Sequence, residues 1–302
     1  MASASLSSRL PDNLWHLAGA GSMGSLAAWR LQQAGMTVRV IRPTALSLQR
    51  TLHWPDGRQV SLSLPSAGDE PIARLLVAVK AGDTHDAVTP LLPRLGASAS
   101  VLRLQNGMGS FDGVALPASA RLFHLVTTDG AWRQGEQIHV VAENQTLIGD
   151  GSPLPPPWFA ELAPYWPGLR WCEQIERAQW AKLAINAVIN PLTAGYHCRN
   201  GELLDGAGRE QQMAALAAEV DAVLGQMFAD WPGDTLARSR EVAQQTAANT
   251  SSMLADVLAA RSTEIAFING YLLRRADALG IDLPAHRQWL TRIGEMPKVA
   301  AP

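Results

Sequence analysis

Short apolar runs recur through the first half of the chain, and glycine or polar residues follow each of them. They occupy residues 14–18, 36–41, 75–79 and 101–104. Continuous apolar runs of this length are typical of parallel strands that are buried on both faces. A helical pattern lies between the first two runs, at residues 25–34, and Gly35 follows it where a C-terminal cap belongs. The pattern therefore predicts a strand–turn–helix–strand unit that begins a parallel sheet.

The later strands of this half are expected to pair as hairpins. Residues 51–64 are predicted to form two strands joined by the turn Pro55-Asp56-Gly57. Residues 121–128, 137–142 and 145–148 are three further candidates, and their spacing is that of hairpins rather than of strand–helix–strand units. We therefore expect these three strands to be antiparallel additions to the edge of the sheet.

The pattern changes near Cys172, after which nearly every stretch has helical spacing. Helices are expected at residues 173–188, 210–230, 235–248 and 263–279. The last of these is the most clearly amphipathic, and Gly280 and Pro284 mark its end. The chain is thus predicted to hold an α/β Rossmann-type domain at residues 1–173, with residues 1–13 as a loose lead-in, followed by an all-α domain at residues 174–302.

The composition excludes several classes of protein. Of the 302 residues, 47% are hydrophobic and 17% are charged, so the chain can bury a core and is not disordered. The net charge is −2 without a basic block, so we expect no nucleic-acid partner. No apolar run approaches the roughly 18 residues of a membrane helix, and the N-terminus lacks the apolar core of a signal peptide. Two cysteines are too few for a disulfide framework or a zinc site. We therefore expect a cytoplasmic protein without a metal site.

A glycine-rich motif, G-x-G-x-x-G, follows the first strand. It consists of Gly19, Ala20, Gly21, Ser22, Met23 and Gly24. In a dinucleotide-binding turn the first glycine permits the tight turn, the second lets the pyrophosphate approach, and the third lets helix and strand pack closely. The amides at the start of the helix then bind the phosphates. A purely structural turn is the alternative, but the strand–helix–strand context favours a dinucleotide.

Residues that follow the other strands are candidates for the same crevice. NAD-binding sites place an acidic residue after the second strand, on the ribose 2′-hydroxyl, whereas this chain has Arg42 there. A guanidinium pairs with a 2′-phosphate, so the sequence predicts NADPH rather than NADH, unless Arg42 is merely a surface arginine. Lys80 and Asn106 follow two later strands, at the ends where parallel sheets bind ligands. Asn106-Gly107 is also an ordinary turn pair.

One helix of the second half carries a row of polar residues on an otherwise apolar surface. Lys182, Asn186 and Asn190 are four residues apart in succession, which places them on one helix face. A solvated stripe usually carries charges of both signs, whereas Lys182 is the only charged residue between residues 179 and 191. Because a buried polar row needs partners, we expect this one to face a ligand. Pro191 is expected to end or kink the helix.

Two residues nearer the C-terminus remain ambiguous. Residues 249–252 (Asn-Thr-Ser-Ser) should interrupt the helices and start a new one, so Ser252 is either a helix cap or a site residue. Glu264 stands at the start of the amphipathic helix. A carboxylate there either interacts with the helix dipole or belongs to a site.

These motifs resemble those of the ketopantoate reductases (2-dehydropantoate 2-reductases). The resemblance runs in order from Leu14 to Arg292. Besides the glycine motif, it is carried by Lys80-Ala81 and by residues 106–109 (NGMG), 182–194 (KLAINAVINPLTA), 200–203 (NGEL), 251–254 (SSML) and 263–265 (TEI).

The resemblance implies NADPH-dependent reduction of 2-dehydropantoate to (R)-pantoate, a step toward pantothenate and coenzyme A. It also implies an active site in a cleft between a Rossmann domain and a helical domain, with Lys182 as the proton donor. The implied substrate residues are Asn106, Asn186, Asn190, Asn200 and Ser252. The implied NADPH-binding residues are those of the glycine motif together with Arg42, Lys80, Asn106, Ala131 and Glu264.

Three departures from the family pattern concern the nicotinamide pocket and the choice of substrate. Asp129 stands where the better-known members have a histidine after two threonines, Ala266 stands where an aspartate is common, and Arg42 aligns only with a one-residue gap. A reductase of another 2-keto acid and a catalytically silent NADPH-binding protein are therefore alternatives. The sequence leaves open whether the chain is a monomer or a homodimer.

Overall fold

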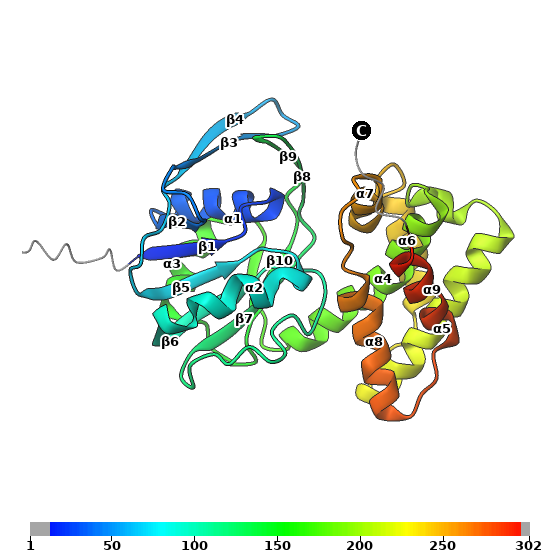
Figure 1. Ribbon diagram of the computed structural model, residues 1–302. Coiled ribbons are helices and arrows are strands. Elements are labelled where there is room, and N and C mark those ends of the chain that lie inside the picture. Colours follow the sequence, from blue (N-terminus) through cyan, green and yellow to red (C-terminus); the bar gives the residue numbers. More distant parts are fainter. Residues whose placement is uncertain (1–12, 297–302) are drawn as a thin grey trace, which may run out of the picture. The chain divides into compact units, whose positions relative to one another are not determined.

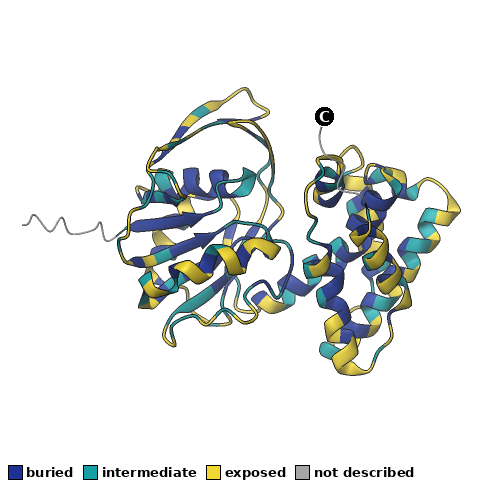
Figure 2. Cartoon of the chain, viewed as in Figure 1, coloured by how far each residue is buried: buried dark blue, intermediate teal, exposed yellow. Residues whose placement is uncertain are grey.

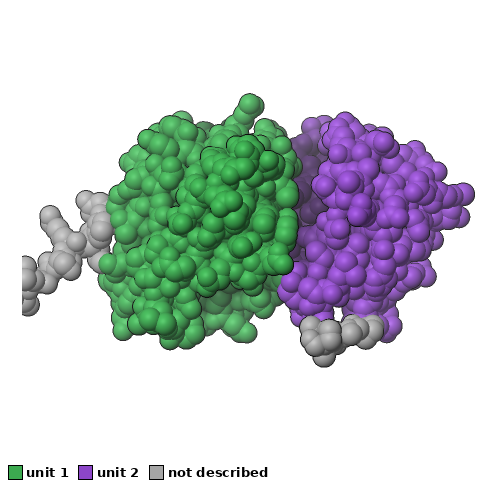
Figure 3. All heavy atoms as spheres, turned by 90° about the horizontal axis from the view of Figure 1, so that it is seen from above, with its two compact units in different colours: residues 1–105, 113–175 green, residues 106–112, 176–302 purple. Residues whose placement is uncertain are grey.

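The computed structural model describes residues 13–296, and the chain forms two compact units (Figure 1, Figure 3). The first, which we call the α/β unit, comprises residues 1–105 and 113–175; the second, the helical unit, comprises residues 106–112 and 176–302. A short segment from the first half of the sequence thus belongs with the helices. The lead-in predicted for residues 1–13 lies outside the described residues except for Asn13, whose side-chain amide donates to the carbonyl of Gly35 at 2.7 Å.

The α/β unit consists mainly of strands. Its strands are β1 (Leu14–Ala18), β2 (Thr37–Ile41), β3 (Leu48–His53), β4 (Gln59–Leu64), β5 (Ile72–Val77), β6 (Leu95–Arg103), β7 (Arg121–Thr127), β8 (Gly130–Gln134), β9 (Gln137–Ala142), β10 (Thr146–Gly149) and β11 (Leu169–Trp171). Its α-helices are α1 (Ser22–Gln33), α2 (Thr84–Val88) and α3 (Pro157–Leu162). Gly35, with φ of 73°, follows α1 as predicted, and the Met36 amide closes the cap on the Leu31 carbonyl at 3.0 Å.

The larger sheet has the strand order β11-β10-β7-β6-β5-β1-β2, and the five strands from β7 to β2 are parallel. Since β1 lies between β2 and β5, the order reverses at β1. In open parallel sheets, ligands bind beyond the carboxyl ends of the strands at such a point. The fold is the predicted Rossmann-like sheet, and the turns that follow β1 and β5 are the places to look for a ligand.

The prediction of three antiparallel edge strands is only partly correct. β10 pairs antiparallel with β7, as expected. β7 instead pairs parallel with β6, and the connection from Arg103 to Arg121 is longer than the dozen or so residues that such a crossover needs. β9 joins a second sheet of order β4-β3-β9-β8, in which the predicted β3–β4 hairpin is antiparallel. Strands β8 and β11 were not predicted.

The helical unit contains the long helices of the second half. They are α4 (Ile175–Tyr196, from residue 176 onward), α5 (Ala207–Met227), α6 (Thr235–Gln245), α7 (Ser252–Leu258), α8 (Ile265–Leu279) and α9 (Pro284–Gly294). The α8 helix ends as predicted, at Gly280 with φ of 71°. Pro284 opens α9, where its missing N–H is harmless. Within residues 13–296, no helix is long and apolar enough to cross a membrane.

Pro191 was expected to end or kink its helix, and it does not end it, because α4 continues to Tyr196. A proline within a helix lacks the N–H that would bond to the carbonyl four residues earlier, here that of Ala187. That carbonyl instead accepts a hydrogen bond from Nδ2 of Asn269, on α8, at 2.8 Å. Asn269 is fully buried. A side chain from another helix thus satisfies the acceptor that the proline leaves open.

Each unit has its own hydrophobic core (Figure 2). The core of the α/β unit contains Trp15, Leu26 and Phe123, from the central strands and α1. The core of the helical unit contains Trp180 and Leu216, together with Met108 from the segment at residues 106–112. Burial of Met108 among the helices explains why this segment belongs to the helical unit.

Candidate functional site

The glycine motif lies between β1 and α1, and each of its glycines has a different steric reason. Gly19 has φ of +98°, and a Cβ there would lie 2.4 Å from the Val79 nitrogen. At Gly24 a Cβ would lie 2.0 Å from the Gly19 carbonyl oxygen. At Gly21, among the described residues, nothing lies within 4 Å of the Cβ position. Two glycines thus permit close packing, and the third leaves space beside the backbone, as a pyrophosphate requires.

The start of α1 offers backbone amides to that space. The helix begins at Ser22, earlier than predicted, and Gly21 is its N-cap. A glycine has no side chain that could occupy the first amides, which are those of Ser22 and Met23 and carry the positive end of the helix dipole. These residues fit the phosphates of a dinucleotide. The geometry of this turn therefore fits the dinucleotide that the sequence predicts.

The turn after β5 lies directly against the glycine motif. The Ala78 amide donates to the Ala18 carbonyl at 2.7 Å, and the backbone of Ala78 and Val79 fills the space beside Gly19. Lys80, the next residue, is partly exposed and forms the N-cap of a short 3-10 helix at Ala81–Asp83. The structure therefore brings Lys80 to the same edge of the sheet as the glycine motif.

Arg42 directly follows β2 and is partly exposed. Two further arginines come from the second sheet: Arg50 on β3 and Arg133 on β8. Burial, followed by the positive charges of Arg133 and Arg42, lowers the pKa of Arg50 despite the opposing charge of Glu136. The positive charge of Arg42 thus acts on Arg50.

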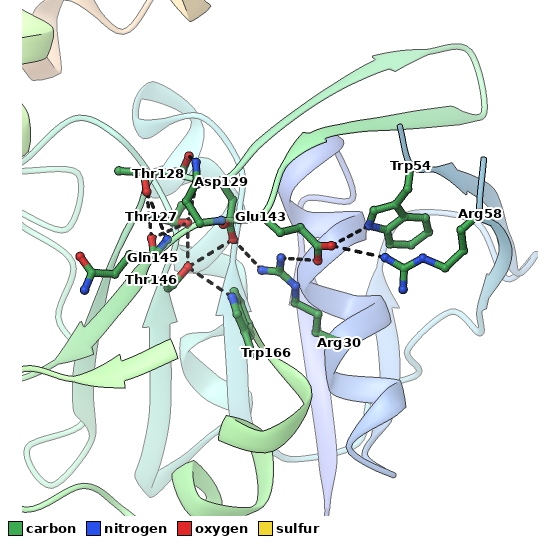
Figure 4. A network of polar contacts seen from close by, with 11 residues as sticks. Arg30, Trp54, Arg58, Thr127, Thr128, Asp129, Glu143, Gln145, Thr146 and Trp166 are labelled. Carbon is green, nitrogen blue, oxygen red and sulfur yellow. Dashed lines mark hydrogen bonds and ion pairs between the residues drawn. The ribbon is translucent and has the colours of Figure 1, made fainter. Parts of the chain in front are cut away.

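Asp129 does not project as a ligand-binding residue would, because it is buried in an ion-pair network (Figure 4). Its Oδ2 accepts a hydrogen bond from Nη1 of Arg30, on α1, at 2.7 Å, and both side chains have 0% exposure. Nη2 of Arg30 donates to Glu143 at 2.9 Å, and the guanidinium lies 4.9 Å from the ring centroid of Trp166. Asp129, which departs from the family pattern, therefore joins the start of β8 to α1 through its ion pair with Arg30. Ala131 lies two residues further on, within β8.

In the helical unit, Lys182 and Asn106 are direct neighbours. Nζ of Lys182, on α4, donates a hydrogen bond to Oδ1 of Asn106 at 2.8 Å. Both side chains are partly exposed. The two residues are 76 positions apart in the sequence, and the chain brings them together because residues 106–112 pack into the helical unit.

The rest of the polar row follows Lys182 along α4. Asn186 is partly exposed one turn later, and Asn190 is 6% exposed two turns later. The residues of a solvated stripe would all be exposed, whereas the residues of this row become more buried from Lys182 to Asn190. Asn200 lies beyond the helix and is 8% exposed. Its Nδ2 donates to Oγ1 of Thr246 at 2.9 Å, while its buried Oδ1 has no hydrogen-bond partner among the described residues.

The ambiguity at residues 249–252 is resolved in favour of Ser251 as the cap. The Leu254 amide donates to Oγ of Ser251 at 3.1 Å, and the same oxygen lies 2.7 Å from Oγ1 of Thr193 on α4. Ser252 is the first residue of α7 and is exposed, so its side chain is accessible to a ligand. The sequence alone could not distinguish these neighbouring serines, since both are good caps.

Glu264 is the N-cap of α8 and is partly exposed. The amides of Phe267 and Ile268 both donate to its carbonyl at 3.0 Å, so the backbone fixes its position at the start of the helix. Ala266, the departure from the family pattern in this turn, is exposed.

Residues 13–296 contain no group of three or more His, Cys, Asp or Glu residues that could hold a metal ion.

Comparison with known proteins places the whole chain in one family. The model of ketopantoate reductase PanE/ApbA matches residues 15–153, and the model of the C-terminal part of that family matches residues 174–296. A 2-dehydropantoate 2-reductase of Yersinia pestis is 37% identical over 259 residues, which are 84% of this chain and 81% of the relative. That of Shigella flexneri is 36% identical over 295 residues, which are 93% and 92% of the two chains. The solved structure of a PanE/ApbA family ketopantoate reductase from Ralstonia eutropha JMP134 has a TM-score of 0.83 at 25% identity and covers 94% of this chain and 98% of that one. The chain therefore belongs to the ketopantoate reductase family.

Proposed function

We propose that this protein reduces 2-dehydropantoate to (R)-pantoate with NADPH, and that Lys182 donates the proton. The observation that carries the proposal is the hydrogen bond of 2.8 Å between Lys182 and Asn106. This bond orients an ammonium at the start of a polar row, within the stretch whose sequence resembles the family motif. A cytoplasmic location fits a reaction that uses NADPH.

The chemistry of a 2-keto acid suits these side chains. The carbonyl oxygen must be polarised and then protonated as it becomes an alkoxide, and an ammonium can do both. The ammonium has three N–H donors, and Asn106 accepts from one of them, which limits its rotation. Asn186 and Asn190 can bond a hydroxyl or a carboxylate without adding a competing charge. When bound, NADPH supplies the hydride.

Substitution of the ammonium tests the proton-donor role. We expect Lys182→Ala to lower kcat with 2-dehydropantoate by at least ~100-fold, the usual contribution of a general acid, while the Kd of NADPH stays nearly unchanged. Turnover is followed by the loss of NADPH absorbance, and NADPH binding by fluorescence. A kcat close to that of the wild type would exclude Lys182 as the donor.

A panel of other 2-keto acids, assayed beside 2-dehydropantoate, tests the substrate. A higher kcat/KM for another member of the panel would identify a different reductase. A wild-type protein that binds NADPH but oxidises it with no keto acid would be a silent binding protein.

The proposed preference for NADPH is supported by Arg42, which directly follows β2 and whose positive charge acts on Arg50. We expect the wild type to have a higher kcat/KM with NADPH than with NADH, and Arg42→Ala to lower that ratio about 10-fold or more, since a hydrogen bond to a charged group contributes ~1.5–3 kcal/mol. Arg170→Ala is the control, because Arg170 is an exposed arginine on β11, at the opposite end of the sheet from β2. A wild type without preference, or equal effects of the two substitutions, would refute the assignment.

A further inference from the structure

The first turns of α8 contact α4 directly. Nδ2 of Asn269 donates to the Ala187 carbonyl, which Pro191 leaves without its helical partner. The same Nδ2 lies 2.9 Å from Nδ1 of His286, and both side chains are fully buried. A buried carbonyl that loses its partner is costly, so this contact fixes the position of α8 along α4. Ala187 lies little more than one turn after Lys182.

The same turns of α8 hold the segment that carries Asn106. The Met108 amide donates to the Phe267 carbonyl at 2.7 Å. Gly107 lies so close to Phe267 that a Cβ there would be 2.4 Å from the Phe267 Cβ and 2.9 Å from its carbonyl oxygen. The Met108 side chain is 6% exposed and belongs to the core of the helical unit. The segment is therefore fixed by a backbone bond, by a close glycine contact and by a buried side chain.

These contacts form a closed path through the helical unit. The path runs from Lys182 along α4 to Ala187, across to α8, from α8 to Gly107 and Met108, and back through Asn106 to the Lys182 ammonium. We propose that α8 positions the Lys182–Asn106 pair, with Gly107 and Met108 as positioning residues that act through Asn106. The proposal rests on the proposed role of Lys182.

A small displacement of the segment is sufficient to break the pair. The hydrogen bond at 2.8 Å is already of ordinary length, and a shift of about 1 Å would take the two atoms beyond hydrogen-bond range. Misplacement on that scale costs roughly 100-fold in rate when it affects a catalytic group. Loosening the segment should therefore reduce kcat even though neither positioning residue is placed in contact with the substrate.

Truncation of the buried Met108 side chain tests whether this side chain holds the segment in place, and it introduces no steric clash. Met108→Ala is expected to lower kcat about 10-fold or more. Met213→Ala is the matched control, because Met213 on α5 is a methionine of the same core with 0% exposure. Both variants should lower Tm, but Met213→Ala should keep kcat within about twofold of the wild type. Equal kcat values for the two variants would overturn the proposal.

Gly107→Ala tests the close contact with Phe267, and Gly225→Ala is its control. Gly225 is an exposed residue of α5, and among the described residues nothing lies within 4 Å of its Cβ position. We expect kcat to fall at least about 10-fold for Gly107→Ala and to stay unchanged for Gly225→Ala. If the Gly107 variant does not fold, the Met108 variant carries the test alone.

A double-mutant cycle with Asn106→Ala separates positioning from general destabilisation. In the Asn106→Ala background, Met108→Ala should lower kcat by less than about twofold, because the residue that it positions is absent. A full and additive loss of kcat in that background would refute the proposal. Inactivity of the wild type with 2-dehydropantoate would refute the proposed function instead, so the two failures are distinguishable.

Discussion

Replacing Asp129 with alanine tests whether the buried ion pair fixes the β8–β9 hairpin on α1. The substitution removes a carboxylate with 0% exposure whose Oδ2 lies 2.7 Å from the Arg30 guanidinium. Its Oδ1 also accepts the Asn144 amide at 2.6 Å. Removing one partner of a buried ion pair lowers the free energy of unfolding by ~3–5 kcal/mol, because the other charge is left uncompensated. Glu143 still contacts Arg30 at 2.9 Å, so we expect the lower end of that range, about 3 kcal/mol.

The free energy of unfolding in urea measures the total loss, and hydrogen exchange of peptides from α1 and β8 locates it in the α/β unit. Glu210→Ala is the control, because its pair with Arg240 is 2.7 Å long but 42–46% exposed. An exposed pair of this kind contributes less than about 1 kcal/mol.

The Arg30→Met substitution completes a cycle that isolates the pair. In the Asp129→Ala background it removes the uncompensated buried charge, so the double variant should be more stable than the sum of the single effects predicts, by about 2 kcal/mol. Asp129→His would place an imidazole against the Arg30 guanidinium and should be no less destabilising than alanine. If Asp129→Ala costs no more than Glu210→Ala, or if the cycle is additive, this pair does not hold the hairpin.

Two further predictions concern the helical unit. Burial lowers the pKa of His286 from 6.5 to about 4, and its Nε2 lies 3.1 Å from the Leu216 carbonyl. Because the unfolded chain binds this proton at a higher pH than the folded one, the stabilisation is complete above pH 6.5 and is lost toward pH 4, by up to about 1.4 kcal/mol per pH unit. Urea unfolding at pH 7 and pH 5 measures this loss, and His286→Gln should reduce it; an unchanged pH dependence would exclude His286 as its source. Asn186→Ala and Ser252→Ala should raise KM or lower kcat for 2-dehydropantoate while leaving the Kd of NADPH unchanged, and unaltered steady-state kinetics would make the polar row structural.

The parts of the fold that the sequence predicted depend on local signals. The glycine motif, the cap at Gly35 and the turn at Asp56-Gly57 are each defined by residues a few positions apart, and the structure confirms all three elements. The pairing of β7 and β9 was mispredicted because a strand sequence specifies which faces are buried but not which strand lies beside it. The partners of these strands depend on tertiary contacts between residues far apart in the sequence, which local patterns do not reveal.

The candidate site shows the same division between local and distant information. The four-residue spacing predicted one helix face for Lys182, Asn186 and Asn190, and α4 contains all three. Nothing local indicated that Asn106, which follows a strand of the sheet, would lie 2.8 Å from Lys182. That contact depends on Met108 entering the core of the helical unit, and an apolar residue in a glycine-rich turn does not reveal which core it will enter.

Pro191 illustrates why a proline need not end the helix that contains it. The rule that proline ends a helix assumes that the carbonyl four residues earlier has no other donor. In this chain the donor is Asn269, 82 residues beyond Ala187. Since Asn269 lies on the helix that also holds Gly107 and Met108, the missing N–H of the proline opens an acceptor that aligns α8 with α4. The position in the lysine-bearing helix that lacks an N–H donor is thus the attachment point for the helix that we propose orients the Lys182 ammonium.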